Sequence, residues 1–245
     1  MERNETHFTI EDFSEAYPPG VEDTYWHLAR NRIIEGQIRD CGKDGPRVLD
    51  IGCGRGILIS HLVKRGIDAY GVDQENVAST NLLHGRTFSQ MSAEELPEDF
   101  RKSVDVIVLG DVIEHLPEPQ QFLASIRKSF ENAGTFVITV PARQEIWSNY
   151  DTRYRHYRRY DLQLLRETVE SVGLKTLELR YFFRPLYCAA RVQLALVRSR
   201  STKVNGPGRL RWLHSLLAQM MLAEYQLLPA GMHGTSAICR ATVVR

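Results

Sequence analysis

The stretch VLDIGCGRGIL at residues 48–58 decides the fold. An apolar run leads into a loop with glycine at three alternate positions, Gly52, Gly54 and Gly56, and an apolar segment follows. Glycine permits a positive φ and lets a ligand approach the backbone closely. Asp73 follows the first glycine by 21 residues, at the end of the next β-branched run. A carboxylate there can accept from both hydroxyls of a ribose, so the pattern predicts a strand–loop–helix unit that binds a nucleotide.

Outward from this loop, short apolar runs alternate with helical segments. The strands expected from β-branched runs without polar alternation are 47–51, 69–72, 104–109 and 135–140, followed by 174–181 and 236–244. The expected helices are 57–65, 119–130 and 161–172. Asp161 is a candidate N-cap of the last helix, and Gly173 stands where a C-terminal glycine belongs. The alternation predicts an α/β fold with a parallel sheet covered by helices on both faces.

The glycine pattern also bears on the identity of the nucleotide. A dinucleotide site usually reads G-x-G-x-x-G and presents helix N–H groups to a pyrophosphate. This chain has G-x-G-x-G, and Asp50 stands two residues before the first glycine. A carboxylate there would repel a pyrophosphate, whereas it suits a ligand that carries an ammonium and a sulfonium. The electrostatics therefore favour S-adenosylmethionine over NAD.

Four motifs in order carry a resemblance to a known family. DIGCGRG, GVD, MSAEELP at 91–97 and VDVIVLGDVIEHL at 104–116 resemble the successive motifs of class I S-adenosylmethionine-dependent methyltransferases, in the small-molecule branch of type 11/12. The resemblance implies an enzyme (EC 2.1.1.-) with a Rossmann-like, doubly wound sheet of seven strands, one antiparallel, plus an N-terminal helix and a C-terminal helical lid or insert. We expect one domain, 1–245, with a cofactor-binding core at 25–182, a helical insert at 183–232 and a final strand at 233–245.

The resemblance also implies a cofactor site. Asp50 and the glycine loop would hold the methionine moiety, Asp73 the ribose, and Ser92 stands where the family often has Asp against the adenine amino group. TYWHLARNRII at 24–34 resembles a helix that closes over the cofactor in one branch, although a helix that only packs on the sheet is the alternative. The expected cofactor contacts are Tyr25, Trp26, Arg30, Asp50, Gly52, Cys53, Gly54, Gly56, Ile57, Asp73, Gln74, Ser92, Ala93, Glu94, Gly110, Asp111, Val112 and His115.

The segment GDVIEHL follows the fourth expected strand, at the edge where open α/β sheets bind ligands. Its D-x-x-E-H pattern resembles the acid-x-x-Glu-His segment of ubiquinone-pathway O-methyltransferases, which is linked to a divalent metal. Asp111, Glu114 and His115 are therefore a candidate Mg²⁺ site. Many small-molecule methyltransferases carry a similar segment without metal, so we expect no metal here. Asp111 and His115 are instead candidate catalytic residues.

YRHYRRYD at 154–161 lies beyond the fifth expected strand, in a loop at the same edge of the sheet. With VPA at 140–142 it resembles a V-P-A…G-H-x-R-R-Y pattern in bacterial methyltransferases, with Arg155 in place of the usual Gly. Arginine grips anions, tyrosine stacks on rings, and histidine can accept a hydroxyl proton. We expect an acceptor-site cover, with arginines that merely pin the loop as the alternative. The candidate acceptor residues are Tyr154, His156, Tyr157, Arg158 and Arg159, with His156 also a candidate catalytic base.

Composition limits the partners. Lys plus Arg total 31 and Asp plus Glu 30, so nothing favours a nucleic-acid binder. Residues 179–223, however, contain eight cations and no acid, which predicts a basic C-terminal face. Its apolar helices could pack on the sheet, form a homodimer seam, cover an amphiphilic acceptor or lie on an anionic bilayer. SRSTKVNGPG at 199–208 is the expected linker between them. Four scattered cysteines, a charged N-terminus and no apolar run of spanning length predict a cytoplasmic protein, peripheral at most.

The leading functional hypothesis is methyl transfer from S-adenosylmethionine to a small molecule, with S-adenosylhomocysteine as product. A hydroxyl acceptor is preferred, and nitrogen or carbon is the alternative. An NAD-dependent oxidoreductase and a non-catalytic module that binds the cofactor are the competing classes. The acceptor itself stays open among anionic, glycosidic and lipid-linked molecules, and the protein is expected to be a monomer or a homodimer.

Overall fold

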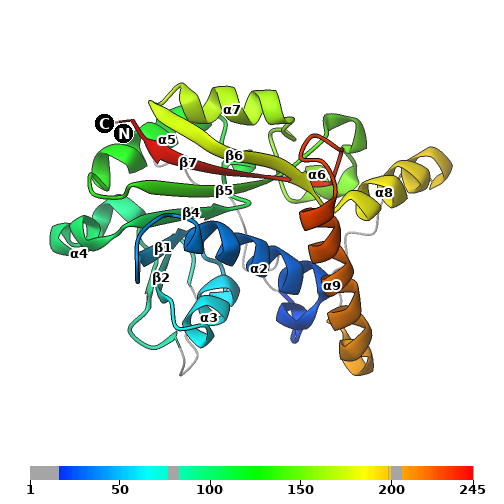
Figure 1. The fold of residues 1–245 in the computed structure, drawn as a ribbon, viewed down its shortest axis with the longest axis horizontal. Coiled ribbons are helices and arrows are strands. Elements are labelled where there is room, and N and C mark those ends of the chain that lie inside the picture. The colour runs from blue at the N-terminus through cyan, green and yellow to red at the C-terminus, as the bar shows by residue number, and fades with distance from the viewer. Residues whose placement is uncertain (1–16, 77–82, 198, 200–205, 245) are drawn as a thin grey trace.

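A computed structural model of the protein describes residues 17–76, 83–197, 199 and 206–244. Its centre is one seven-stranded sheet in the order β3-β2-β1-β4-β5-β7-β6 (Figure 1). All neighbouring strands are parallel except those that pair with β7, which runs antiparallel to both β5 and β6. The strands are β1 (Arg47–Ile51), β2 (Asp68–Asp73), β3 (Thr87–Ser89), β4 (Val106–Gly110), β5 (Thr135–Pro141), β6 (Leu174–Phe182) and β7 (Ser236–Val243).

Helices cover both faces of this sheet, as the alternation of segments predicts (Figure 1). The α-helices are α2 (Tyr25–Arg39), α3 (Ile57–Lys64), α4 (Glu98–Ser103), α5 (Pro119–Ser129), α6 (Asn149–Arg153), α7 (Leu162–Glu170), α8 (Arg184–Val197) and α9 (Arg211–Leu227). Short 3-10 turns are η1 (Val21–Asp23), η3 (Ala93–Glu95), η4 (Ile113–His115), η5 (Gln144–Ile146) and η6 (Gly208–Leu210). One core cluster joins the sheet to α5 and α7, and a second joins its other face to α2, α3 and α9. The predicted doubly wound fold is confirmed.

The expected strands and helices fall within one or two residues of the observed ones. β4 and β5 are buried along almost their whole length, which explains why both read as continuous apolar runs. The side chain of Asp161 accepts from the N–H of Leu164 at 2.7 Å, which confirms the N-cap of α7. Gly173 follows that helix with φ +75°. The edge strand β3 escaped notice because its three residues are all half-buried and show no hydrophobic period.

The C-terminal helices α8 and α9 lie between β6 and β7 in sequence and stand together at one end of the molecule (Figure 1). α9 packs along α2, where the N–H of Tyr25 donates to His214 Nδ1 at 3.1 Å. The buried side chains of Arg184 and Glu224 join the two C-terminal helices through an ion pair of 2.5 Å. The expected linker at 199–208 falls largely outside the described residues, as does the charged N-terminal segment. Within the described part of the chain, every helix is too short or too polar to cross a bilayer.

Candidate active site

The glycine loop connects β1 to α3 with three residues in the left-handed region. Gly52, Gly54 and Gly56 have φ of +76°, +55° and +69°. A Cβ on Gly52 would lie 2.8 Å from the side chain of Val112, and one on Gly56 only 2.5 Å from Leu83. Side chains are therefore excluded twice, by the backbone conformation and by the space. The loop presents bare backbone at the carboxyl ends of β1 and β4, where a ligand can approach it.

Three carboxylates surround this loop. Asp50 is almost wholly buried, and burial raises its pKa to about 7, with the nearby Asp73 and Asp111 adding to the rise against the pull of Arg30. Asp73 Oδ2 accepts from the N–H of Gly54 at 2.7 Å, and its pKa is raised by burial. One guanidinium faces three acids, so the site is suited to a ligand that brings positive charge.

Arg30 is the cation at the centre of this group. Its Nε lies 2.7 Å from Asp111 Oδ2, and its guanidinium lies over the ring of Trp26, 5.1 Å from the centroid. A Cβ on Gly110 would lie 2.2 Å from Arg30 Nη2, so the arginine reaches β4 only because that residue is glycine. Asp111 itself has a φ of +59°, which is uncommon outside glycine and occurs at functional sites. α2 thus carries the predicted Trp26 and Arg30 to the end of β4.

The sequence prediction missed two residues at this place. The Oη of Tyr17 would lie 3.0 Å from a Cβ on Gly54, and the pKa of this phenol is raised by burial and by Asp73, Asp111 and Asp50. Its ring therefore lies over the glycine loop. The ring of His27 packs against Trp26 with centroids 4.8 Å apart, and burial lowers the His27 pKa to about 3. The only sequence signals were an aromatic residue before Pro-Pro and a position one residue beyond Trp26.

The remaining predicted cofactor residues lie in three places. Cys53 is buried within the loop, Ile57 begins α3, and the exposed Gln74 follows Asp73. Ala93 and Glu94 belong to η3, whose N-cap is Ser92. Glu94 accepts from Ser125 of α5 at 2.9 Å, so its carboxylate is engaged within the protein. Contacts of these residues with the cofactor stay predictions.

η4 brings Glu114 and His115 to the site, but their neighbour there is His156 and not the predicted Asp111. Their ligand atoms and one of His156 lie within 4.8 Å of one another, whereas Asp111 pairs with Arg30. The rings of His115 and His156 are 4.8 Å apart. Burial lowers the pKa of His115 to about 3, and the same cause raises that of Glu114 far above its usual value. The group combines two imidazoles with one carboxylate, a set that suits Mg²⁺ less well than all-oxygen ligands.

The segment YRHYRRYD lies directly above this group. Asp151, which is fully buried, accepts at one oxygen from His156 Nδ1 at 2.9 Å and from Arg159 Nε at 2.7 Å. Its other oxygen accepts from the N–H of Ser148 at 2.9 Å. Burial acts to raise the pKa of Asp151, but the hydrogen bonds from His156 and Arg159 outweigh it and hold the pKa low. Asp151 therefore stays ionised and fixes the imidazole of His156. Sequence reasoning missed this acid.

The two arginines of the segment are engaged with the protein. Arg159 is 5% exposed and also donates to the carbonyl of Ala142 at 2.9 Å. Arg158 Nη2 donates to the carbonyl of Pro117 at 2.6 Å. These contacts agree with the alternative that the two arginines pin the loop. Contact of either arginine with an acceptor stays a prediction. Tyr154 is buried and Tyr157 is 58% exposed.

Arg155 stands where the resembling pattern has glycine. Its φ is +54°, in the left-handed region that glycine adopts without strain. The N–H of Tyr157 then donates to the carbonyl of Glu114 at 2.8 Å, which ties the segment to η4. The strained arginine is thus the residue at which the chain turns back over the Glu114–His115 pair.

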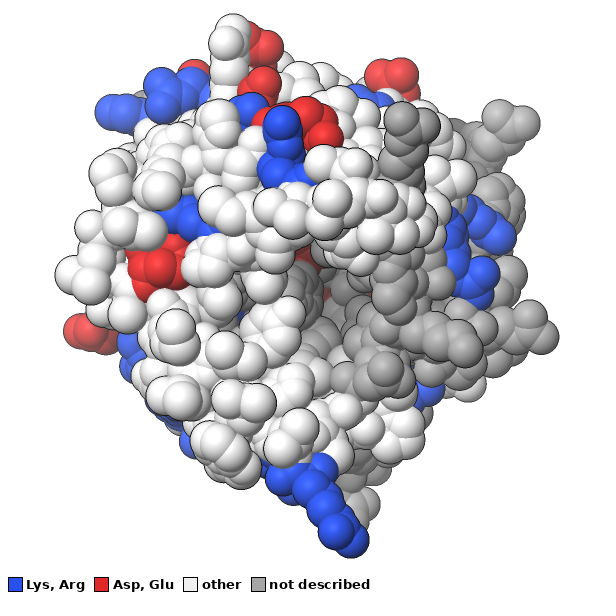
Figure 2. Space-filling view, turned by 90° about the vertical axis from the view of Figure 1, so that its right-hand side faces the viewer, with Lys and Arg blue, Asp and Glu red and all other residues white. Residues whose placement is uncertain are grey.

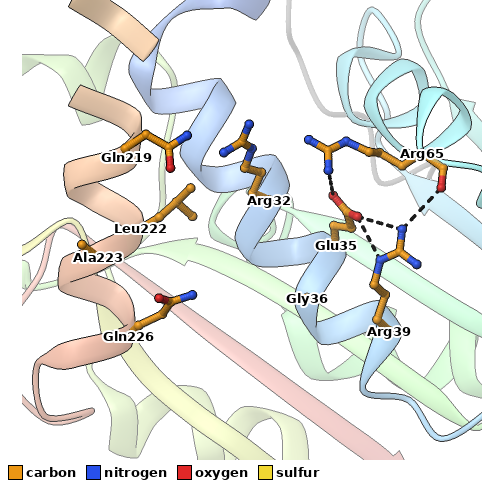
Figure 3. Close-up of a pocket in the computed structure, with 9 residues that line it drawn as sticks. All are labelled: Arg32, Glu35, Gly36, Arg39, Arg65, Gln219, Leu222, Ala223 and Gln226. Atoms are coloured by element: carbon orange, nitrogen blue, oxygen red, sulfur yellow. Dashed lines mark hydrogen bonds and ion pairs between the residues drawn. The ribbon is translucent and has the colours of Figure 1, made fainter. Parts of the chain in front are cut away.

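A hollow lies between α2 and α9, with a volume of about 540 Å³ (Figure 3). Glu35 accepts there from Arg39 at 2.9 Å and pairs with Arg65 at 3.8 Å. It also meets His61 Nε2 at 2.8 Å. These contacts join α2 to α3. Among the residues that the structure describes, none that lines the hollow comes from the glycine loop or from the carboxyl ends of the strands, so the hollow is distinct from the site described above.

Comparison with known proteins agrees with the geometry of the site. The profile of a methyltransferase domain family matches residues 25–179, which is more than half of the chain. The chain belongs to the class I S-adenosylmethionine-dependent methyltransferases. The glycine cradle and the excess of carboxylates fit S-adenosylmethionine, whose ammonium and sulfonium are cationic. The predicted family, enzyme class and cofactor are confirmed at this level.

Individual relatives of this methyltransferase are distant. The ubiquinone biosynthesis O-methyltransferase of Methylococcus capsulatus is 34% identical over 98 residues, which are 37% of this chain and 41% of that protein. The enzyme of the same name from Hahella chejuensis is 36% identical over 88 residues, 33% of this chain and 37% of its own. The matches thus span about two fifths of the length of these relatives.

Solved structures share the fold of the methyltransferase. A SAM-dependent methyltransferase from Archaeoglobus fulgidus is 20% identical with a TM-score of 0.53, over 94% of this chain and 97% of that one. Phosphoethanolamine N-methyltransferase 2 of Haemonchus contortus, solved with S-adenosyl-L-methionine, is 16% identical with a TM-score of 0.57, over 97% of this chain and 60% of the other.

Proposed function

We propose that this methyltransferase moves the methyl group of S-adenosylmethionine to a hydroxyl of a small molecule, with His156 as the general base. The observation that carries the proposal is the pair formed by His156 and the ionised, buried Asp151, 2.9 Å apart. A carboxylate on Nδ1 holds the proton at that nitrogen, so Nε2 becomes the basic atom. One ring nitrogen of His156 lies within 4.8 Å of the ligand atoms of Glu114 and His115.

The residues divide the chemistry between them. S-adenosylmethionine supplies a methyl group on a sulfonium, which leaves as a neutral thioether. Asp50 and Asp73 would hold its charged and hydroxylated parts at the glycine loop. His156 would take the proton of the acceptor hydroxyl as the oxygen attacks the methyl carbon, and Asp151 would stabilise the resulting imidazolium. Much of the rate would come from alignment of the oxygen with the methyl group.

Support for oxygen as the acceptor atom comes from the two ubiquinone biosynthesis O-methyltransferases that resemble this chain. Nitrogen and carbon remain the alternatives. For the acceptor we propose a ring-bearing molecule that stacks on the exposed Tyr157 and is anionic, glycosidic or lipid-linked. We propose that the step needs no metal, with the Glu114–His115–His156 group as the place where one would bind.

The test is a turnover screen with labelled S-adenosylmethionine on phenolic, sugar and lipid-linked hydroxyl acceptors. With an acceptor in hand, His156→Gln should lower kcat by about 10²–10⁴-fold while cofactor affinity, measured by calorimetry, stays unchanged. The exposed His84→Gln is the matched control and should keep wild-type turnover. Normal kcat in His156→Gln together with a lowered melting temperature would show that the histidine only pins the loop. Tighter binding of NAD than of S-adenosylmethionine would refute the methyltransferase proposal itself.

A further inference from the structure

The second half of α8 and one side of α9 leave large apolar side chains in solvent. Of the residues of α8, only Arg184 and Ala190 are buried. On α9, positions 212, 216 and 220 follow one another at a spacing of four and so form one stripe. The members of this C-terminal apolar face are Val192 (60% exposed), Leu196 (78%), Val197 (64%), Trp212 (67%), Leu216 (52%) and Met220 (57%). These side chains fall into two groups, one at the end of α8 and one along α9, and the two helices diverge from each other (Figure 1).

Most of the charges beside this face are positive. Arg191, Arg209 and Arg211 are exposed next to it, and residues 179–223 contain no acid at all. The first acid beyond them, Glu224, is buried and paired with Arg184. Arg211 reaches Asp23 at 3.3 Å but keeps 70% of its side chain exposed. An apolar stripe with a tryptophan, flanked by cations, is the pattern of helices that lie in a membrane interface.

The face lies at the end of the molecule where the parallel strands β4 and β5 end (Figure 1). Figure 2 views this end and shows a broad surface of uncharged residues with a hollow near its centre. α8 is joined to the loop that follows β5, since Tyr187 Oη donates to Glu145 at 2.8 Å. Gln144, the neighbour of Glu145, accepts a hydrogen bond from the N–H of Arg159, which belongs to the segment YRHYRRYD. A surface on which α8 docks would therefore lie close to the segment YRHYRRYD.

A second copy of the chain fits this face less well than a lipid surface. In an isologous dimer the same patch comes from both partners, so a patch flanked by Arg191, Arg209 and Arg211 would meet a second patch flanked by the same cations. No acid of residues 179–223 is present to neutralise them. An anionic bilayer offers hydrocarbon to the apolar side chains and phosphate to the arginines at the same depth.

We infer that the C-terminal apolar face is a docking surface for an anionic membrane, so that the active site works at the lipid–water boundary. The inference does not depend on the acceptor or on the role of His156. It rests on the exposed apolar stripe, on the flanking arginines and on the lack of acids.

The test is co-sedimentation of the full chain with vesicles of phosphatidylglycerol and phosphatidylcholine, against vesicles of phosphatidylcholine alone. Binding should occur only with the anionic vesicles and should fall at high salt, because the arginine term is screened. Leu196→Glu and Trp212→Glu should each weaken it by about tenfold or more. Leu177→Glu is the matched control, an exposed leucine (48%) on β6 outside the face, and should bind like wild type.

Other outcomes would overturn the inference. Absence of binding to either vesicle, or equal binding to both, would do so. So would concentration-dependent dimerisation in the ultracentrifuge that Leu196→Glu abolishes, since the face would then be an interface between copies. Circular dichroism and cofactor calorimetry on each variant separate these results from misfolding. Vesicle binding can also be measured whether or not an acceptor is found, so failure of the proposed methyl transfer would be seen separately.

Discussion

Binding of S-adenosylmethionine should weaken steeply in acid because of Asp50. This carboxyl is almost wholly buried, and its pKa is raised to about 7, first by burial and then by Asp73 and Asp111. The cationic cofactor prefers the ionised form, so below that pKa each binding event must first release a proton. The dissociation constant should rise about tenfold for each pH unit below about 7, and level off above it. Between about pH 8 and about pH 5 the loss is about 100-fold, or about 2.7 kcal/mol.

The assay is titration calorimetry across this pH range, in buffers that differ in ionisation enthalpy so that the released proton is seen directly. Asp50→Asn is the control. Its affinity should be lower than that of wild type at about pH 8, by about 1.5–3 kcal/mol, and its profile should lose the step near about pH 7. Any dependence that remains in this variant belongs to the cofactor or to other groups. A wild-type affinity that is flat from about pH 5 to about pH 8, without proton release, would refute the reasoning.

Thermal unfolding of the free protein tests the raised pKa of Asp50 without the cofactor. The pKa of Asp50 in the folded state lies above its ordinary value of 3.8, so the folded state binds the proton more tightly than the unfolded state does. The free energy of unfolding should therefore rise as the pH falls from about 7 towards 3.8, because Asp50 takes up a proton in the folded state only. Above about pH 7 the ionised, buried carboxylate lowers the free energy of unfolding. Asp50→Asn should raise the free energy of unfolding at about pH 8, by at most about 4 kcal/mol.

Further expectations concern single residues. Asp73→Ala should weaken cofactor binding by about 1–3 kcal/mol in calorimetry, because the ribose hydroxyls and the N–H of Gly54 lose a charged acceptor; unchanged affinity with an intact fold would contradict the assignment. EDTA should leave turnover intact, since the Glu114–His115–His156 group is poorly suited to Mg²⁺; activity that is abolished by chelation and restored by a metal ion would show the opposite. Arg155→Gly should raise stability by about 1 kcal/mol in thermal unfolding, because the residue has a φ of +54°, whereas Arg153→Gly within α6 should lower it.

The sequence by itself determined six of the seven strands and the glycine loop. Each rests on a local pattern: apolar runs of strand length, glycines at alternate positions and Asp73 one strand later. Gly52 and Gly56 have φ of +76° and +69°, and their neighbours leave no room for a Cβ. Because only glycine fits such positions, the glycines in the sequence predict the conformation of the loop. Asp161 and Gly173 mark the ends of α7 for the same reason, because caps act within a few residues.

Only the tertiary structure decided which side chains meet beside His156. Asp111 turns to Arg30, 81 positions earlier, and leaves Glu114 and His115 to gather with His156. Such partners are brought together by the order of strands in the sheet and by the direction of each side chain, neither of which a short motif encodes. Asp151 lies five residues before His156, yet no pattern in the surrounding sequence predicted that this acid would be buried. The left-handed turn at Arg155 and the bond from Arg159 place it under the imidazole, and both depend on the packing of the loop against η4.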